Sequence, residues 1–194
     1  GGSRPGIYLR TDFYSSGLRG ILTHEFVHLL LVEVAGGRAL PAWLNEGMAR
    51  YYEYELGLQG TRPAAVRILQ FRDTDLAKSA ALSDTLLSLT ALESQPDWNS
   101  QTDTSRINLQ YAEAYMAARF LIETYGAGSA VEIVRKIGQG SELSGAILEV
   151  TGSRYQDFRE HFAEWLGDWK DPERTSIRAY IQPLNGIMDS ADSI

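Results

Sequence analysis

Apolar and polar side chains alternate clearly over only one short stretch of the chain. Residues 7–13 read IYLRTDF, in which Ile7, Leu9, Thr11 and Phe13 alternate with Tyr8, Arg10 and Asp12. A period of two is typical of a half-buried β-strand. The sequence therefore predicts a strand over residues 7–13 and almost no other clear strand.

Apolar residues recur at helical spacing over most of the remaining chain. The predicted helices span residues 17–35, 41–55, 63–80, 105–125, 129–139, 142–150 and 154–170. Glycines at positions 36, 37, 126 and 152 stand where such helices end. The predicted fold class is mainly α, formally α+β, with a small and incomplete sheet. We expect one domain over residues 1–170 and a partly disordered C-terminal extension over residues 171–194.

The longest polar stretch without periodicity is ESQPDWNSQTDTS, which spans Glu93 to Ser105. Polar segments of this kind between periodic segments are typical of loops. We expect a solvated connection here, and the alternative is a lid over a functional site.

Composition excludes several classes of function. With 194 residues, of which 44% are hydrophobic, the chain is long enough to form a single core. A net charge of -7 argues against a nucleic-acid or anionic-membrane partner, since both need a basic surface. The longest apolar run, residues 21–35, contains histidines and glutamates and is not a membrane span. The chain has no cysteine, which excludes disulfides and thiolate zinc sites and leaves the cellular compartment open.

Two histidines and a glutamate interrupt that apolar run in the motif HEFVH, residues 24–28. On a helix, His24 and His28 lie on one face, where both rings can converge on one ion. Glu25 is rotated by about 100° from His24, which puts it beside such an ion. Two imidazoles can bind Zn²⁺, and the carboxylate can take a proton from the activated water. The simpler alternative is a pair of core histidines with Glu25 as a flanking charge, so the interpretation depends on a third ligand.

Two residues are candidates for the third ligand. His161 lies at the edge of an aromatic stripe, and the favoured interpretation is a histidine on the flank of a helix. Glu46 lies in PAWLNEGMARYYE, a second helix that can return beside the first after the Gly36 and Gly37 break. The neighbours of Glu46 look buried, and a lone buried glutamate is rarely tolerated without a partner or metal. Glu46 is therefore the better candidate.

These motifs resemble those of a known family. HEFVH followed after a short spacer by WLNEG looks like the gluzincins, which are zinc peptidases, and within them the aminopeptidase N branch and its small bacterial relatives, the peptidase MA-like domains. Residues 111–126 and 131–166 are similar to later helices of these proteins. The resemblance covers most of residues 18–166, and it implies that residues 1–170 form a zincin-like metallopeptidase domain.

The resemblance implies a role for individual residues. His24, His28 and Glu46 would bind Zn²⁺, and Glu25 would be the general base in the hydrolysis of peptide or protein substrates. Tyr111 begins a helix that carries a functional tyrosine in the family. Its periodicity alone indicates only a position facing the core, with Tyr115 as the rival one turn later.

The sequence also departs from the aminopeptidase pattern. The spacer before Glu46 is one residue shorter than in aminopeptidase N, which suggests a tighter turn. The Gly-x-Met-Glu-Asn segment that holds a free amino terminus in aminopeptidases is absent, so we expect endopeptidase activity.

Three alternatives stay open. Glu53 either orients a metal ligand or is a solvated helix residue. The strand over residues 7–13 either pairs with an extended substrate or is internal to a sheet. The competing class of function is a non-catalytic binding module of the same fold, which would use exposed aromatic residues at Tyr51, Tyr52, Tyr54 and Trp98.

Overall fold

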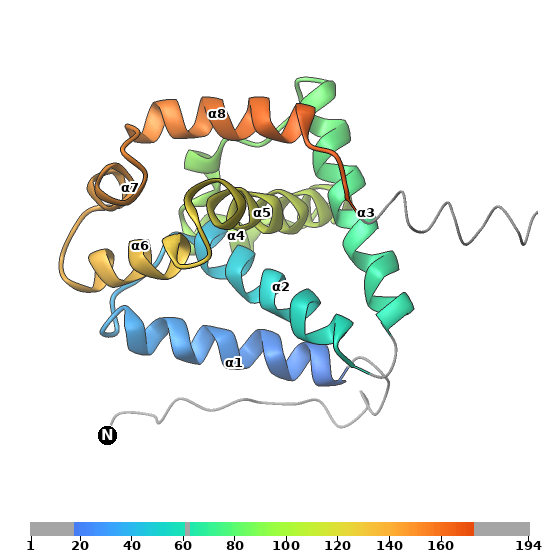
Figure 1. The fold of residues 1–194 in the computed structure, drawn as a ribbon, viewed down its shortest axis with the longest axis horizontal. Helices are drawn as coiled ribbons and strands as arrows, with labels where there is room; N and C mark the ends of the chain where they lie inside the picture. Colours follow the sequence, from blue (N-terminus) through green and yellow to red (C-terminus); the bar gives the residue numbers. More distant parts are fainter. Residues whose placement is uncertain (1–17, 61–62, 173–194) are drawn as a thin grey trace, which may run out of the picture.

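The computed structural model describes residues 18–60 and 63–172, and regular structure in this part of the chain is helical (Figure 1). The elements are α1 (Leu18–Val34), α2 (Ala42–Leu58), α3 (Pro63–Leu82), the 3₁₀ helix η1 (Leu89–Leu92), α4 (Gln95–Ser100), α5 (Thr104–Tyr125), α6 (Ser129–Gly138), α7 (Leu143–Thr151) and α8 (Tyr155–Asp168). The prediction of a mainly α fold is confirmed for these residues. The predicted strand and nearly all of the predicted extension lie outside them.

None of the helices in the described part of the chain combines the length and apolar character needed to cross a membrane.

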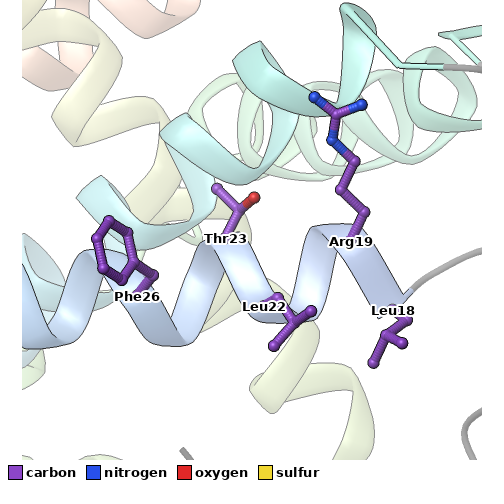
Figure 2. Close-up of a pocket in the computed structure, with 5 residues that line it drawn as sticks. All are labelled: Leu18, Arg19, Leu22, Thr23 and Phe26. Atoms are coloured by element: carbon purple, nitrogen blue, oxygen red, sulfur yellow. The ribbon is translucent and has the colours of Figure 1, made fainter.

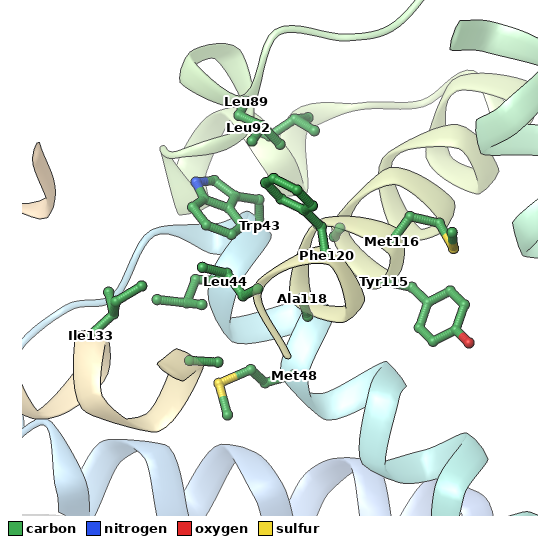
Figure 3. Close-up of a cluster of buried hydrophobic side chains, with 14 of the residues drawn as sticks. Trp43, Leu44, Met48, Leu89, Leu92, Tyr115, Met116, Ala118, Phe120 and Ile133 are labelled. Atoms are coloured by element: carbon green, nitrogen blue, oxygen red, sulfur yellow. The ribbon is translucent and has the colours of Figure 1, made fainter. Parts of the chain in front are cut away.

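Helix α5 runs through the middle of the molecule and contacts α2, α3, α6 and α8 (Figure 1). Side chains from α2, η1, α5 and α6 fill the core around it. Figure 3 labels Trp43, Leu44, Met48, Leu89, Leu92, Tyr115, Met116, Ala118, Phe120 and Ile133 in this cluster, all of them buried. The core therefore fixes α2 firmly against α5.

Helices α2 and α5 approach each other at Gly47. A Cβ atom at this position would lie 2.1 Å from the backbone oxygen of Ala114, far inside van der Waals contact. Because Glu46 directly precedes Gly47, this close approach also sets the position of Glu46 relative to α5.

A tight turn joins α1 to α2. Gly36 and Gly37 have φ angles of +58° and +76°, a conformation that glycine adopts without strain. The Gly37 N–H donates to Val32 O at 2.9 Å, and the Gly36 N–H donates to Glu33 O at 3.0 Å. This pair of bonds is a Schellman motif, which ends α1 and satisfies its last carbonyls. The chain then enters α2, which packs along α1.

The prediction of an unstructured loop from Glu93 to Ser105 is wrong at its centre, where α4 forms. Ser94 caps this helix by accepting a hydrogen bond from the Asp97 N–H at 3.3 Å. The Trp98 side chain is only 6% exposed and packs edge-on against Tyr111 at 5.2 Å. A cap and one buried anchor are thus enough to order a short helix that periodicity cannot detect.

The side of α1 that faces away from α2 is apolar and exposed in the described structure. Figure 2 shows Leu18 and Leu22 pointing away from the neighbouring α2 ribbon, whereas Arg19 extends toward it. Leu22 and Phe26 are 36% and 53% exposed. The two histidines occupy a different face of the same helix, directed at α2.

Candidate metal centre

Three ligand-type side chains converge between α1 and α2. His24 Nε2 lies 3.4 Å from Glu46 Oε2, and His28 Nε2 lies 3.6 Å from the same oxygen. The three ligand atoms all lie within 4.8 Å of one another. The Schellman turn explains this arrangement, since it returns α2 along the histidine face of α1. The three predicted ligands thus form a group that could hold a metal ion.

The other nitrogen of each imidazole also has a partner. His24 Nδ1 donates to Glu53 Oε2 at 3.1 Å, and His28 Nδ1 donates to Asn45 Oδ1 at 3.0 Å. When Nδ1 carries the proton, the lone pair of Nε2 is free to face an ion. The two hydrogen bonds therefore orient both rings so that their Nε2 atoms face Glu46. They also place Glu53 against His24, which excludes the alternative of a solvated residue.

The electrostatics of the site favour a positive charge next to Glu46. Burial lowers the pKa of His24, but contacts with Glu46 and Glu53 outweigh it and raise the pKa to about 9. Burial raises the pKa of Glu53, but His24 and Arg50 outweigh that effect and leave it below its ordinary value. Without an ion, the cluster therefore holds a proton on His24, where a bound cation would supply the charge instead.

A cavity of about 330 Å³ opens beside these residues, lined by Ile21, His24, Glu25, Arg50, Glu53 and Tyr111. Glu25 is exposed, in contrast to the more buried histidines. It lines the cavity together with His24. Of the three candidate ligands, His24 lines this cavity.

Tyr111 of α5 also lines this cavity. Burial raises the pKa of Tyr111, and the charges of Glu46 and Glu25 act in the same direction, although a hydrogen bond with Trp98 lowers it. The phenol therefore remains a hydrogen-bond donor at neutral pH.

Tyr115 lies elsewhere, in the core between α3 and α5. Its hydroxyl accepts hydrogen bonds from Gln70 Nε2 at 2.9 Å and from Arg119 Nη1 at 3.0 Å. The structure thus brings Tyr111, and not Tyr115, to the cavity. His161 is exposed on α8 and does not belong to the group of three ligands.

Comparison with known families agrees with this site. The family model of the peptidase MA superfamily matches residues 6–168, and the chain belongs to this superfamily. No curated protein and no solved structure matches the chain. Membership suggests a metallopeptidase-like function, which fits the group of two histidines and one glutamate.

Proposed function

We propose that the protein is a zinc metallopeptidase of the gluzincin type, related to the aminopeptidase N branch, with its catalytic domain over residues 1–170. One observation carries the proposal. The Nε2 atoms of His24 and His28 converge on one oxygen of Glu46, while both Nδ1 atoms are hydrogen-bonded elsewhere.

The spacing between Glu46 and each of the two imidazoles is compatible with Zn²⁺. Tetrahedral coordination with bonds of about 2.0–2.2 Å places neighbouring ligand atoms roughly 3.3–3.6 Å apart. The two separations between imidazole and carboxylate are 3.4 and 3.6 Å. Three protein ligands also leave a fourth position open, as in catalytic rather than structural zinc sites.

The chain supplies groups for each proton that must move. Zn²⁺ at this position would activate water and polarise the carbonyl of the scissile bond. Glu25 accepts the proton of the attacking water and delivers it to the departing amine. Tyr111 donates a hydrogen bond to the oxygen that gains negative charge, and it can do so because its phenol is protonated.

The substrate is a peptide or protein, and we favour cleavage within the chain. The sequence lacks the segment with which aminopeptidases hold a free amino terminus. Arg50 also lines the cavity, but Glu53 and Asp73 already contact its guanidinium, so it is poorly suited to hold the carboxylate of a free carboxyl terminus.

The burial of two of the four proposed contact residues argues against the non-catalytic binding module. Tyr54 and Trp98 are 1% and 6% exposed, so neither offers a surface to a partner. Only Tyr51 and Tyr52 of the four proposed aromatic residues are partly exposed. A binding module also has no chemical need for Glu25 beside the three ligands.

Metal analysis combined with Glu25→Gln tests the proposal. The variant should keep stoichiometric zinc and lose about 10²- to 10⁴-fold in peptide hydrolysis, because the amide cannot accept the water proton. Glu33→Gln is the matched control, since Glu33 is an exposed glutamate on the same helix and should leave the rate unchanged.

Three results would contradict parts of the proposal. If Glu25→Gln cleaves peptides as fast as the unaltered protein, the base is another residue. If Glu46→Ala keeps the zinc affinity, Glu46 is not a ligand. Zinc binding without cleavage of any peptide in a broad library would favour the binding module.

A further inference from the structure

Arg50 lies on α2, one turn after Glu46 and three residues before Glu53. Its Nη1 donates to Glu53 Oε2 at 3.0 Å. The same oxygen accepts the hydrogen bond from His24 Nδ1 at 3.1 Å. One carboxylate oxygen therefore connects the guanidinium directly to the imidazole of a candidate metal ligand.

The other side of Arg50 is anchored in the interior. Its Nε lies 3.6 Å from Asp73 Oδ2 on α3, and this oxygen accepts a hydrogen bond from the Tyr54 hydroxyl at 2.6 Å. Asp73 and Tyr54 are 2% and 1% exposed. Because Asp73 and Tyr54 are buried, the guanidinium is anchored to a well-packed part of the core.

Aromatic rings further limit the movement of the guanidinium. Its central carbon lies 5.1 Å from the centre of the Tyr111 ring and 5.7 Å from that of Tyr54. Distances below about 6 Å permit cation–π attraction. Arg50 is thus held by contacts with α2, α3 and α5 together.

The charge of Arg50 is directed at the protein rather than at a substrate. Glu53 and Asp73 both contact the guanidinium. Arg50 Nε is buried and forms no hydrogen bond to the described residues, so an ion pair alone joins it to Asp73. With two carboxylates against it, Arg50 is poorly suited to bind an anionic substrate.

Removing Arg50 would take away the permanently charged partner of Glu53 and leave the His24 contact. The Glu53 side chain is only 15% exposed, and a buried carboxylate that loses its partner is strongly disfavoured. The carboxylate would then turn toward water or take up a proton. Either change removes the acceptor that orients His24.

We propose that Arg50 is a positioning residue of the metal centre, which holds the Glu53 carboxylate toward His24 Nδ1 and thereby directs His24 Nε2 at the ion. This inference rests on the proposed zinc site. It assigns to Arg50 an effect on metal affinity that does not require any contact with metal or substrate.

The test is zinc affinity, measured by competition with a chromophoric chelator. Residues that orient metal ligands typically contribute about 10- to 100-fold to affinity, so Arg50→Met and Glu53→Gln should each weaken binding by at least about 10-fold. If Arg50 acts through Glu53, the double variant should be within about 2-fold of Glu53→Gln alone, because coupled residues are not additive.

Two further variants separate this role from general stabilisation. Arg50→Lys keeps a cation within reach of Glu53 and should recover most of the affinity. Arg72→Met removes another arginine that contacts Asp73, at 3.2 Å and from the exposed side, but none of the Glu53 contacts. It should bind zinc like the unaltered protein. Thermal unfolding of the zinc-free proteins shows which variants fold.

Each contrary result overturns the inference. Action through Glu53 would be excluded by an unchanged zinc affinity in Arg50→Met, or by an equal loss of affinity in Arg72→Met. It would also be excluded if the double variant lost affinity by the product of the two single losses. If Arg50→Met does not fold, Glu53→Gln with unchanged affinity overturns it as well. If the unaltered protein does not bind zinc, the proposed function is overturned too. If it binds zinc tightly and the Arg50 variants bind equally well, this inference alone is overturned.

Discussion

Tyr111 and Tyr115 lie one helical turn apart on α5, but their hydroxyls meet different surroundings. Tyr111 lines the cavity together with His24 and Glu25, whereas the Tyr115 hydroxyl accepts hydrogen bonds from Gln70 and Arg119. A single turn of helix thus separates a candidate oxyanion donor from a structural residue.

The Tyr111→Phe substitution tests this difference. It should lower turnover by about 10²- to 10³-fold, which is the usual effect of deleting one oxyanion donor. Zinc content and folding should be nearly unchanged, because the ring still packs against Trp98. Steady-state kinetics with metal analysis would measure both quantities.

Tyr115→Phe is the control and should remain active, although losing the acceptor for two buried donors should reduce its stability. If the two variants exchanged their behaviour, Tyr115 would be the functional residue. If both stayed fully active, tyrosine would have no part in the reaction.

Residues near the candidate metal centre differ in how far the sequence could predict them. His24, His28 and Glu46 follow from local motifs, because helical spacing and one turn bring them together. Asn45 was missed, although its position beside Glu46 in WLNEG was an available signal. Arg50 and Asp73 could not be predicted, since their contact depends on how α3 packs against α2.

At the scale of elements, the contact between α2 and α5 depends on a glycine, which has no side chain. Gly47 faces the backbone oxygen of Ala114, and a backbone atom cannot move aside as a flexible side chain can. The distance from Glu46 to the helix that carries Tyr111 is therefore fixed by two backbones in contact.

The Gly47→Ala substitution should force these helices apart. We expect a loss of about 1–3 kcal/mol in the free energy of unfolding, as for other overpacked cores. Denaturant unfolding would measure it. Gly145→Ala in α7 is the matched control, because a Cβ there would meet none of the described atoms within 4 Å. This control should be neutral or gain up to about 1 kcal/mol from better helix propensity. Equal stability of the two variants would show that the contact is not tight.

Periodicity predicted the long helices well, although α3 buries Gln70, Asp73 and Thr74 beside two alanines rather than an apolar stripe. Helix α4 was missed, since six residues are too few to show a helical period. The sequence nevertheless contains a start signal there, with Ser94 three residues before Asp97 and a proline between them. Capping chemistry was therefore more informative than hydrophobic pattern for this element.

At the scale of the whole molecule, Glu113 makes stability depend on pH. This residue of α5 is fully buried, and its Oε1 accepts a hydrogen bond from the Leu87 N–H at 2.9 Å. Burial raises the pKa of Glu113 from 4.5 to about 8, although the Leu87 bond and the charge of Arg106 act to lower it. The folded protein thus keeps a proton that the unfolded chain releases.

The stability contributed by this proton is complete below pH 4.5 and is lost as the pH rises through about 8. Glu113→Gln cannot titrate, so its stability relative to the unaltered protein should improve by on the order of 2–4 kcal/mol between pH 5 and pH 8.5. Denaturant unfolding across this range would measure the difference. An exposed glutamate on α8 offers the control, since Glu164→Gln should follow the unaltered protein. Parallel profiles for all three proteins would contradict a protonated Glu113.

The packing of the helices around α5 was beyond the reach of sequence patterns. An apolar stripe indicates that a helix is covered on one face but does not identify the covering helix. The family resemblance placed α1, α2 and α5 near one site, while the position of α3 behind Arg50 emerged only from the structure.

The Schellman turn after α1 has a consequence for the order in which the molecule assembles. All three candidate ligands lie between His24 and Glu46, so a short hairpin brings them together. Contacts between residues close in sequence generally form first during folding, because little chain must be ordered to close the loop. Tyr111 comes from a much later segment and meets the ligands only after α5 has docked. We therefore expect the hairpin to gather the three candidate ligands before the cavity beside them is complete, so that metal binding would precede the proposed activity.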